Sequence, residues 1–150
     1  MIKDCKSEVK GMFNKILIAA DGSDHSIRCA EKALHLGEQN PQAHFTVVYA
    51  IDGQTSKEDI LHHYDKTIVN EKRRQRLEPI INLLEQKGVT YVVEFIHGEP
   101  GPAIVEFANK GEYDLVVVGS RGLNALQEMV LGSVSHKIAK RVLAPVMIVK

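Results

Sequence analysis

The sequence is short of the features that mark secreted, membrane-bound and nucleic-acid-binding proteins. Its two cysteines, Cys5 and Cys29, form no C-x-x-C pair, so a disulfide framework is not expected and a reducing compartment is favoured. Nineteen Lys and Arg balance nineteen Asp and Glu, which leaves no basic excess for a nucleic-acid or membrane surface. No apolar run approaches the roughly 20 residues that span a bilayer, and the first residues contain no apolar signal segment. These absences predict a cytoplasmic protein without nucleic-acid or membrane partners.

The chain divides into a short polar segment and one domain. Residues 1–12 are polar and aperiodic, and we expect them to form a flexible N-terminal extension. Residues 13–150 contain no internal repeat, low-complexity tract or linker, and their length suits a single domain.

Short apolar runs alternate with amphipathic segments along this domain. The runs are rich in β-branched residues, which is typical of strands buried on both faces. The expected strands lie in Lys15–Ser23, His44–Asp52, Thr90–His97, Asp114–Gly119 and Ala144–Lys150. The expected helices lie in Ser23–Gln39, Ser56–Gly88, Gly98–Lys110 and Ser133–Val142, with Ser23 or Asp24 as the first N-cap. This alternation predicts an α/β fold with a doubly wound parallel sheet and helices on both faces, and it leaves the strand order open.

The segment 56–88 combines high charge with a helical apolar period. Pro79 lies within the apolar stripe and predicts a kink or split near Gln75. The run Glu71–Arg76 is expected to be the solvated face of this helix. The expected stripe consists of Leu61, Tyr64, Ile68, Leu77, Ile80 or Ile81, and Leu84.

Glycines cluster after the fourth expected strand. Gly119 ends that strand, Gly122 follows it, and Gly132 with Ser133 opens the last expected helix. Glycine costs backbone entropy, so a cluster indicates positive φ angles or the close approach of a ligand. Ligands of open α/β sheets bind beyond the carboxyl ends of the strands, and a helix N-terminus attracts phosphate. The cluster therefore predicts a phosphate site with Arg121 nearby, and a tight turn with an ordinary helix cap is the structural alternative.

Two common phosphate motifs are absent, and a third pattern takes their place. No Gly-Lys-Ser or Gly-Lys-Thr occurs, and the first strand ends in Asp-Gly-Ser, which excludes a Walker A loop and a Rossmann fingerprint. The spacing G-x2-G-x9-G-S from Gly119 to Ser133 resembles the nucleotide-binding motif of the universal stress protein family. KILIAADGSDHS, HGEPGPAIVEFANKGEYDLVVVGSRG and GSVSHKIAKRVLAPVMIVK are similar to the same family, so the resemblance covers residues 13–150.

The resemblance implies a flavodoxin-like or Rossmann-like five-stranded sheet of the adenine nucleotide alpha hydrolase type, in the order 3-2-1-4-5. Members with the intact motif bind ATP, so a nucleotide-binding regulatory protein is implied, with ATP ordering the loop between Gly119 and Gly132. Magnesium would be held only through the nucleotide phosphates. By position, the implied nucleotide contacts are Ala19, Asp21, Ala50, Val118, Gly119, Arg121, Gly122, Gly132, Ser133, Val134 and Ser135. Ala19 stands where some nucleotide-binding members have proline.

The family also implies a homodimer that pairs through the last strand, Pro145–Val149. The apolar character of this strand supports the pairing, because proteins usually cover an exposed edge strand. Two other functions stay open. A slow ATPase or phosphotransfer enzyme would need a group that orients water, and the loop offers only Glu128. A dimeric interaction module would need no nucleotide. We assign no catalytic residue and no protein ligand for a metal.

Other polar residues carry weaker signals. A response-regulator receiver needs an acceptor Asp at the end of the third strand, where this chain has Phe95–His97. His62 and His63 point about 100° apart on a helix, so with Asp65 they are unsuited to one metal ion. The sequence places His97 and His136 near the expected ligand edge, and Cys29 is expected to pack as a small hydrophobe.

Overall fold

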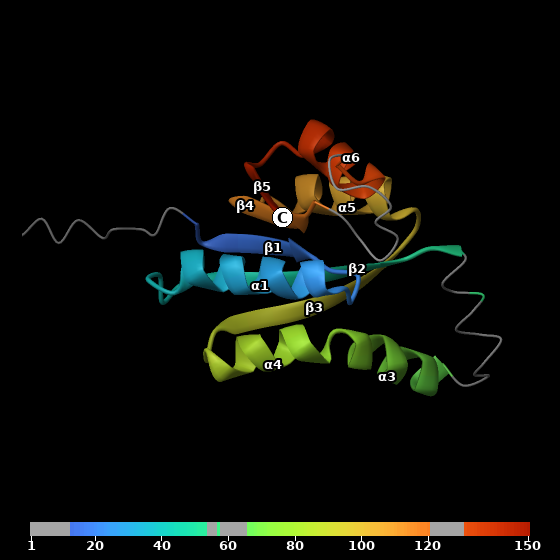
Figure 1. Ribbon diagram of the computed structural model, residues 1–150, viewed down its shortest axis with the longest axis horizontal. Coiled ribbons are helices and arrows are strands. Elements are labelled where there is room, and N and C mark those ends of the chain that lie inside the picture. Colours follow the sequence, from blue (N-terminus) through green and yellow to red (C-terminus); the bar gives the residue numbers. More distant parts are fainter. Residues whose placement is uncertain (1–12, 54–56, 58–65, 121–130) are drawn as a thin grey trace, which may run out of the picture.

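Five parallel strands form one sheet in the computed structural model, which describes residues 13–53, 57, 66–120 and 131–150 (Figure 1). The strand order is β3-β2-β1-β4-β5, which confirms the order that the family resemblance implied. The strands are β1 (Lys15–Ala19), β2 (His44–Ile51), β3 (Thr90–His97), β4 (Leu115–Gly119) and β5 (Val146–Val149). The described helices are α1 (Asp24–Gly37), α3 (Lys66–Arg76), α4 (Glu78–Gln86), α5 (Pro100–Gly111) and α6 (Ser133–Arg141).

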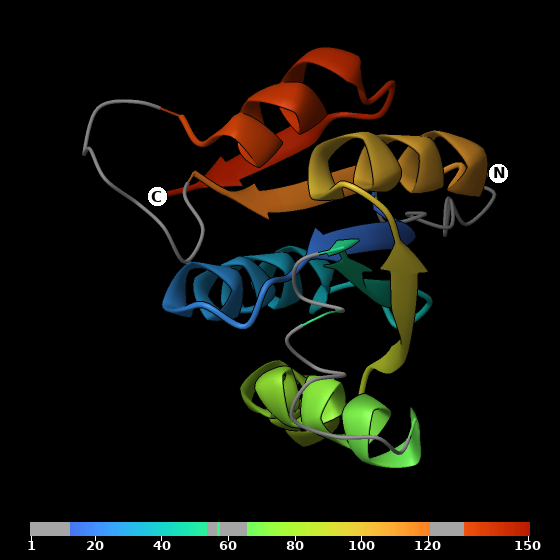
Figure 2. The ribbon, with the colours of Figure 1, turned by 90° about the vertical axis from the view of Figure 1, so that its right-hand side faces the viewer.

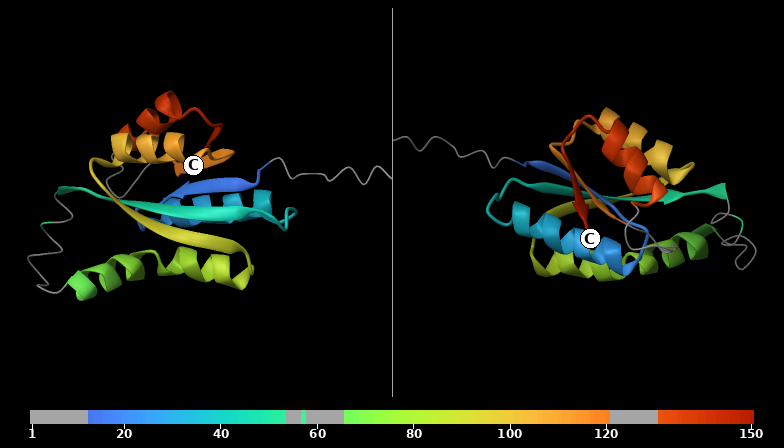
Figure 3. Two further views of the ribbon diagram at one scale, coloured as in Figure 1. Left: turned by 180° about the vertical axis from the view of Figure 1, so that it is seen from behind. Right: turned by 45° about the horizontal axis from the view of Figure 1, so that its top comes forward.

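Helices cover both faces of the sheet, as the alternation of elements predicts. Figure 1 and the two views of Figure 3 show α1, α3 and α4 on one side of the strands and α5 and α6 on the other. In Figure 2, α5 and α6 lie side by side on that second face, where α6 packs on β4 and β5 and α5 packs on β2 and β3. None of the described helices combines the length and the apolarity that crossing a membrane requires.

The central strands are apolar on both faces because both faces are covered. Within β1, Ile16 and Ile18 join the core beneath α1 and α4, whereas Leu17 and Ala19 join the core beneath α5 and α6. Successive side chains of a strand point to opposite faces, so a strand between two helical layers reads as a continuous hydrophobic run. This is the physical basis of the strand predictions.

Helix α1 begins where its capping residue predicts. The Ser23 side chain accepts a hydrogen bond from the Ser26 N–H, which identifies Ser23 rather than Asp24 as the N-cap. Cys29 is wholly buried in the middle of this helix and packs as a small hydrophobe, as expected.

The predicted helix 56–88 is split, and part of its expected stripe is wrong. Helix α3 ends at Arg76 and α4 begins at Glu78, which confirms the break expected from Pro79. Ile68 is 47% exposed, and its neighbour Val69 is buried instead. Helical spacing explains why Val69 is buried. Residues four positions apart lie on the same face of a helix, and counting back from the buried Leu77 in steps of four gives Arg73 and Val69. Leu61 and Tyr64 lie outside the described residues.

The predicted solvated run Glu71–Arg76 contains one buried side chain. Arg73 is only 7% exposed, whereas the other five residues of the run are exposed. Arg73 occupies the inward phase of α3 between Val69 and Leu77. The prediction followed the charge of Arg73 and missed that the helical period places this residue on the inward face.

Candidate functional site: the carboxyl ends of β1, β2 and β4

Three of the predicted nucleotide contacts lie on one face of the sheet at the carboxyl ends of its central strands. Ala19 ends β1 and Val118 precedes the last residue of β4, and the pairing of Ile18 with Val117 sets them beside each other. Ala50 lies near the end of β2 and packs on the same side as these two. Ala19 and Val118 are buried and Ala50 is half-buried, so together they form a small-sided apolar floor.

The loop after β1 holds Asp21 in a defined conformation. The Ser23 N–H donates to Asp21 Oδ1 at 2.9 Å, which closes a short turn around Gly22. Gly22 has a φ of +81°, a left-handed conformation that favours glycine. The turn positions the half-buried Asp21 carboxylate at the same edge of the sheet as Ala19.

The two ends of the glycine motif meet in space. The Gly132 N–H donates to the Ser120 carbonyl at 2.9 Å, and the Ser135 hydroxyl donates to the Gly119 carbonyl. The Ser120 N–H in turn donates to the Val149 carbonyl at the end of β5, at 2.8 Å. Hydrogen bonds therefore join the start of α6 to the end of β4, and Ser120 also joins this region to the end of β5. Arg121 and Gly122 lie outside the described residues.

Gly132 is the N-cap of α6, and its backbone does not explain why it is glycine. Its φ of −58° and ψ of 155° are open to any residue. Among the described residues, no side chain caps the helix by a hydrogen bond to its first amide groups, those of Ser133, Val134 and Ser135. A helix start carries the positive end of the helix dipole and unpaired N–H groups, which together attract an anion. The backbone angles of Gly132 therefore do not by themselves require glycine.

The seryl side chains at this helix start differ in what they do. Ser135 is 4% exposed, and its hydroxyl is engaged with the Gly119 carbonyl, so it positions the two motif segments. Ser133 is exposed at the first turn of α6, and Val134 is half-buried against the core beneath α5 and α6. His136 is exposed on the same helix. Ser133 is therefore the hydroxyl best presented to an anion at this helix start.

Metal ligands and reactive groups are sparse around this edge. In the part of the chain that the structure describes, no three His, Cys, Asp or Glu side chains are grouped so as to hold a metal ion. His62, His63, Asp65 and Glu128 lie outside the described residues. Burial, together with the smaller effect of the Asp21 carboxylate, raises the pKa of the Cys29 thiol to about 12. Cys29 is therefore a protonated core residue at neutral pH.

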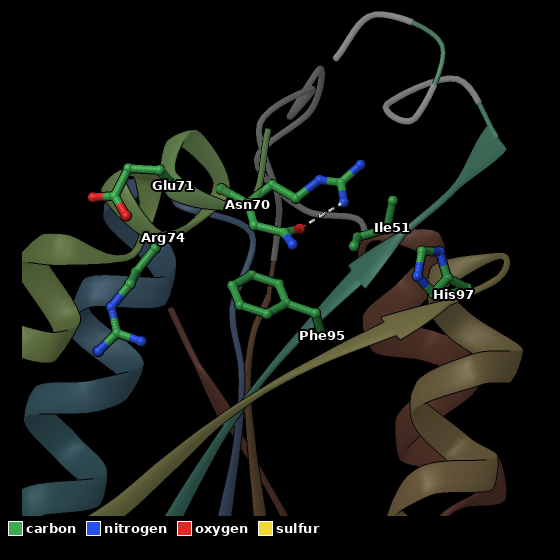
Figure 4. Close-up of a pocket in the computed structure, with 7 residues that line it drawn as sticks. Ile51, Asn70, Glu71, Arg74, Phe95 and His97 are labelled. Atoms are coloured by element: carbon green, nitrogen blue, oxygen red, sulfur yellow. Dashed lines mark hydrogen bonds between the residues drawn. The ribbon is translucent and has the colours of Figure 1, made fainter. Parts of the chain in front are cut away.

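Sequence reasoning missed a hollow between α3 and the ends of β2 and β3. It measures about 550 Å³ and is lined by Ile51, Asn70, Glu71, Arg73, Arg74, Phe95 and His97 (Figure 4). His97, which the sequence places at the carboxyl edge of the sheet, lies here. The signal for Arg73 was present in its spacing of four from Val69 and from Leu77, but its charge made it look like a surface residue.

Comparison with known proteins gives a consistent result. The model of the universal stress protein family matches residues 12–150. The chain is 37% identical to the universal stress protein YxiE of Bacillus subtilis, over 93% of this chain and 100% of that protein. It is 30% identical to the universal stress protein MJ0531 of Methanocaldococcus jannaschii, over 94% of this chain and 84% of that protein.

Solved structures agree with the sequence relatives. The structure of MJ0577 from Methanocaldococcus jannaschii superposes with a TM-score of 0.79 at 26% identity, covering 93% of this chain and 96% of that one. A universal stress protein in complex with cAMP and one from Archaeoglobus fulgidus in complex with dAMP share the fold, with TM-scores of 0.67 and 0.69. The fold, the family model and the relatives agree, and the chain belongs to the universal stress protein family.

Proposed function

We propose that the protein binds an adenine nucleotide, ATP, at the carboxyl edge of the sheet and acts as a cytoplasmic regulatory protein. The observation that carries the proposal is Gly132, which lies at an uncapped helix start, is joined to Ser120, and has backbone angles that do not require glycine. Solved family members in complex with cAMP, AMP and dAMP support an adenine nucleotide as the ligand class.

Each predicted contact has a place in this proposal. The phosphates would lie against Gly119, Gly132 and the first amides of α6, with Arg121 and Gly122 completing the loop. Asp21 would face the ribose. Ala19, Ala50 and Val118, at the strand ends, would border the adenosine. Magnesium would be held by the phosphates, since no metal-binding group is found among the described residues.

The contacts of Ser120 offer a route from the nucleotide to the edge of the sheet. The Ser120 carbonyl accepts a hydrogen bond from the Gly132 N–H, and the Ser120 N–H donates to the Val149 carbonyl. Ser120 therefore joins the start of α6 to the edge strand β5. We propose that β5 pairs with β5 of a second copy in a homodimer. Ile148 is 37% exposed and Leu143, just before the strand, is 88% exposed, which leaves apolar surface for a partner to cover.

Gly132→Val tests the nucleotide site, because the added side chain would occupy the space left for a phosphate. ATP at 100 times its dissociation constant should raise the free energy of unfolding of the wild-type protein by about 2.7 kcal/mol. The same ATP concentration should leave Gly132→Val unchanged in a urea titration. The matched control is Ala139→Val, which adds bulk to an exposed position of the same helix and should keep the response.

The nucleotide that accompanies the purified protein separates the alternatives. Denaturation and mass analysis should release ATP at up to one molecule per chain. A mixture dominated by ADP would favour a slow ATPase or phosphotransfer enzyme, with turnover lost in Ser133→Ala. An ATP response shared by wild type and Gly132→Val, or absent from both, would contradict the proposal. Absence from both would leave the nucleotide-independent interaction module.

A further inference from the structure

The loop that carries Asp21 is packed against the end of α3. Gly22 has a φ of +81°, and a Cβ atom placed on it would lie 3.2 Å from the Arg76 carbonyl oxygen and 3.4 Å from the Arg76 Cβ. A side chain at this position would therefore meet both backbone strain and a crowded contact. Glycine lets the loop after β1 approach α3 this closely, so the last residue of α3 supports the loop.

Arg76 is joined to the sheet through Tyr49. Its guanidinium donates a hydrogen bond to the Tyr49 hydroxyl at 3.0 Å, and Tyr49 is one of the partners that hold this arginine. Tyr49 is 6% exposed in β2, and its ring meets the Phe95 ring edge-on, with centroids 5.9 Å apart and an interplanar angle of 70°. Because the ring is packed in the core, its hydroxyl is an acceptor in a fixed position. The sheet therefore holds the residue that supports the Gly22 turn.

These contacts determine where the Asp21 carboxylate lies. The Ser23 N–H donates to Asp21 Oδ1 at 2.9 Å, so the orientation of the carboxylate follows the backbone of the turn. A chain of direct contacts runs from the Tyr49 hydroxyl, through Arg76 and the turn, to Asp21 at the carboxyl edge of the sheet. A ligand-binding group keeps its geometry when neighbouring packing and hydrogen bonds support it. Tyr49 is such a support, although it lies in the core.

We propose that the Tyr49 hydroxyl is a positioning group for ribose recognition. It would act without touching the nucleotide, by holding Arg76 and so keeping the Gly22 turn in the conformation in which Asp21 meets the ribose. This role rests on the proposed function, because it lies within that nucleotide site. A carboxylate accepts hydrogen bonds from the 2′ and 3′ hydroxyls, so the protein should prefer nucleotides that carry them. The preference should depend on Tyr49.

Tyr49→Phe removes the hydroxyl and keeps the ring that packs on Phe95. ATP and 2′,3′-dideoxy-ATP are the probes, since they differ only in the two ribose hydroxyls. In isothermal titration calorimetry of the full chain, the wild type should bind ATP roughly tenfold more tightly than dideoxy-ATP. Tyr49→Phe should weaken ATP binding roughly fivefold, the worth of one hydrogen bond, and leave the affinity for dideoxy-ATP unchanged.

Tyr91→Phe is the matched control. The Tyr91 hydroxyl belongs to the neighbouring strand β3 and donates to Glu85 at 2.8 Å, so its loss should change neither affinity. Asp21→Ala removes the carboxylate and should abolish the preference for ATP. Adding Tyr49→Phe to Asp21→Ala should cause no further loss, because the two changes act on the same contact.

An equal loss of affinity for both nucleotides in Tyr49→Phe would indicate a general structural effect and would overturn the positioning role. An unchanged ATP affinity in Tyr49→Phe, an equal effect of Tyr91→Phe, or additive losses in the double variant would overturn it too. So would a wild type that binds ATP and dideoxy-ATP equally well. Failure of the wild type to bind ATP at all would contradict the proposed function, and this role with it. ATP binding by the wild type therefore distinguishes the two failures.

Discussion

Cys29 illustrates how strongly burial changes a single side chain. Its thiol lies in the core between α1 and the sheet, with no exposed surface. Desolvation is the largest cause of its raised pKa, and the Asp21 carboxylate adds to it. The residue looked unremarkable in the sequence, yet it links the pH dependence of stability to the packing of α1.

The raised pKa of Cys29 predicts a loss of stability in alkaline solution. The unfolded thiol ionises near its ordinary pKa of 9.0, whereas the folded thiol holds its proton up to about 12. Between these values the unfolded state binds fewer protons, so the free energy of unfolding falls as the pH rises. At pH 10 the loss should be about 1.4 kcal/mol.

Urea titrations at about pH 8 and about pH 10 measure this loss, and Cys29→Ala is the control. The variant should lose less stability than wild type between the two pH values, by that same amount. An equal loss of unfolding free energy in the two proteins would show that the thiol ionises as readily in the folded state as in the unfolded state. Cys5 is present in both proteins and cancels.

At the scale of elements, the break between α3 and α4 decides which side chains reach the core. Leu77 lies between the two helices and is wholly buried, and it sets the phase of the residues before it. Pro79 and the periodicity were enough to predict the break. The assignment of Ile68 to the stripe was wrong because one helical phase was assumed on both sides of the break. The period of the apolar residues does not show where that phase shifts.

Leu77→Ala and Ile68→Ala should therefore behave very differently. Removal of the wholly buried Leu77 side chain leaves a cavity and should lower the free energy of unfolding by about 2–5 kcal/mol. Ile68 is 47% exposed, and its replacement should change that free energy by less than about 0.5 kcal/mol. Urea unfolding of both variants is the measurement. Comparable losses would mean that Ile68 also packs in the core.

For the whole molecule, the two edges of the sheet differ in what they expose. Strand β5 forms one edge, and its end is joined to Gly132 at the start of α6 through Ser120. Strand β3 forms the other edge, and its exposed positions alternate, including Val92 at 51%. Among the described residues, the β5 edge is the one that hydrogen bonds of Ser120 join to the start of α6.

Ile148→Lys should dissociate the proposed homodimer, because pairing of two β5 strands would then bring two charges into an apolar interface. We expect the dimer dissociation constant to rise by roughly a hundredfold, as measured by sedimentation equilibrium. Val92→Lys places the same charge on the β3 edge and should leave the assembly unchanged. A monomeric wild type, or a dimer indifferent to Ile148→Lys, would contradict pairing through β5.

The sequence by itself determined the class of fold, the existence of each described strand and the approximate position of the helix break, and it narrowed the first helix cap to Ser23 or Asp24. These follow from local causes, namely side-chain period, capping chemistry and proline. It also identified the glycine segment, because the backbone entropy that Gly119 and Gly132 lose on folding calls for a structural or functional reason.

The tertiary structure decided the rest. Strand order, the meeting of Ser120 with Gly132, the burial of Arg73 and the hollow beneath α3 all depend on which faces pack together. Those contacts join residues far apart in the chain, so they produce no periodic pattern in the sequence. Their energies depend on how the layers of the fold pack together. The family resemblance supplied the strand order in advance, whereas the hollow became visible only when β2, β3 and α3 were seen together.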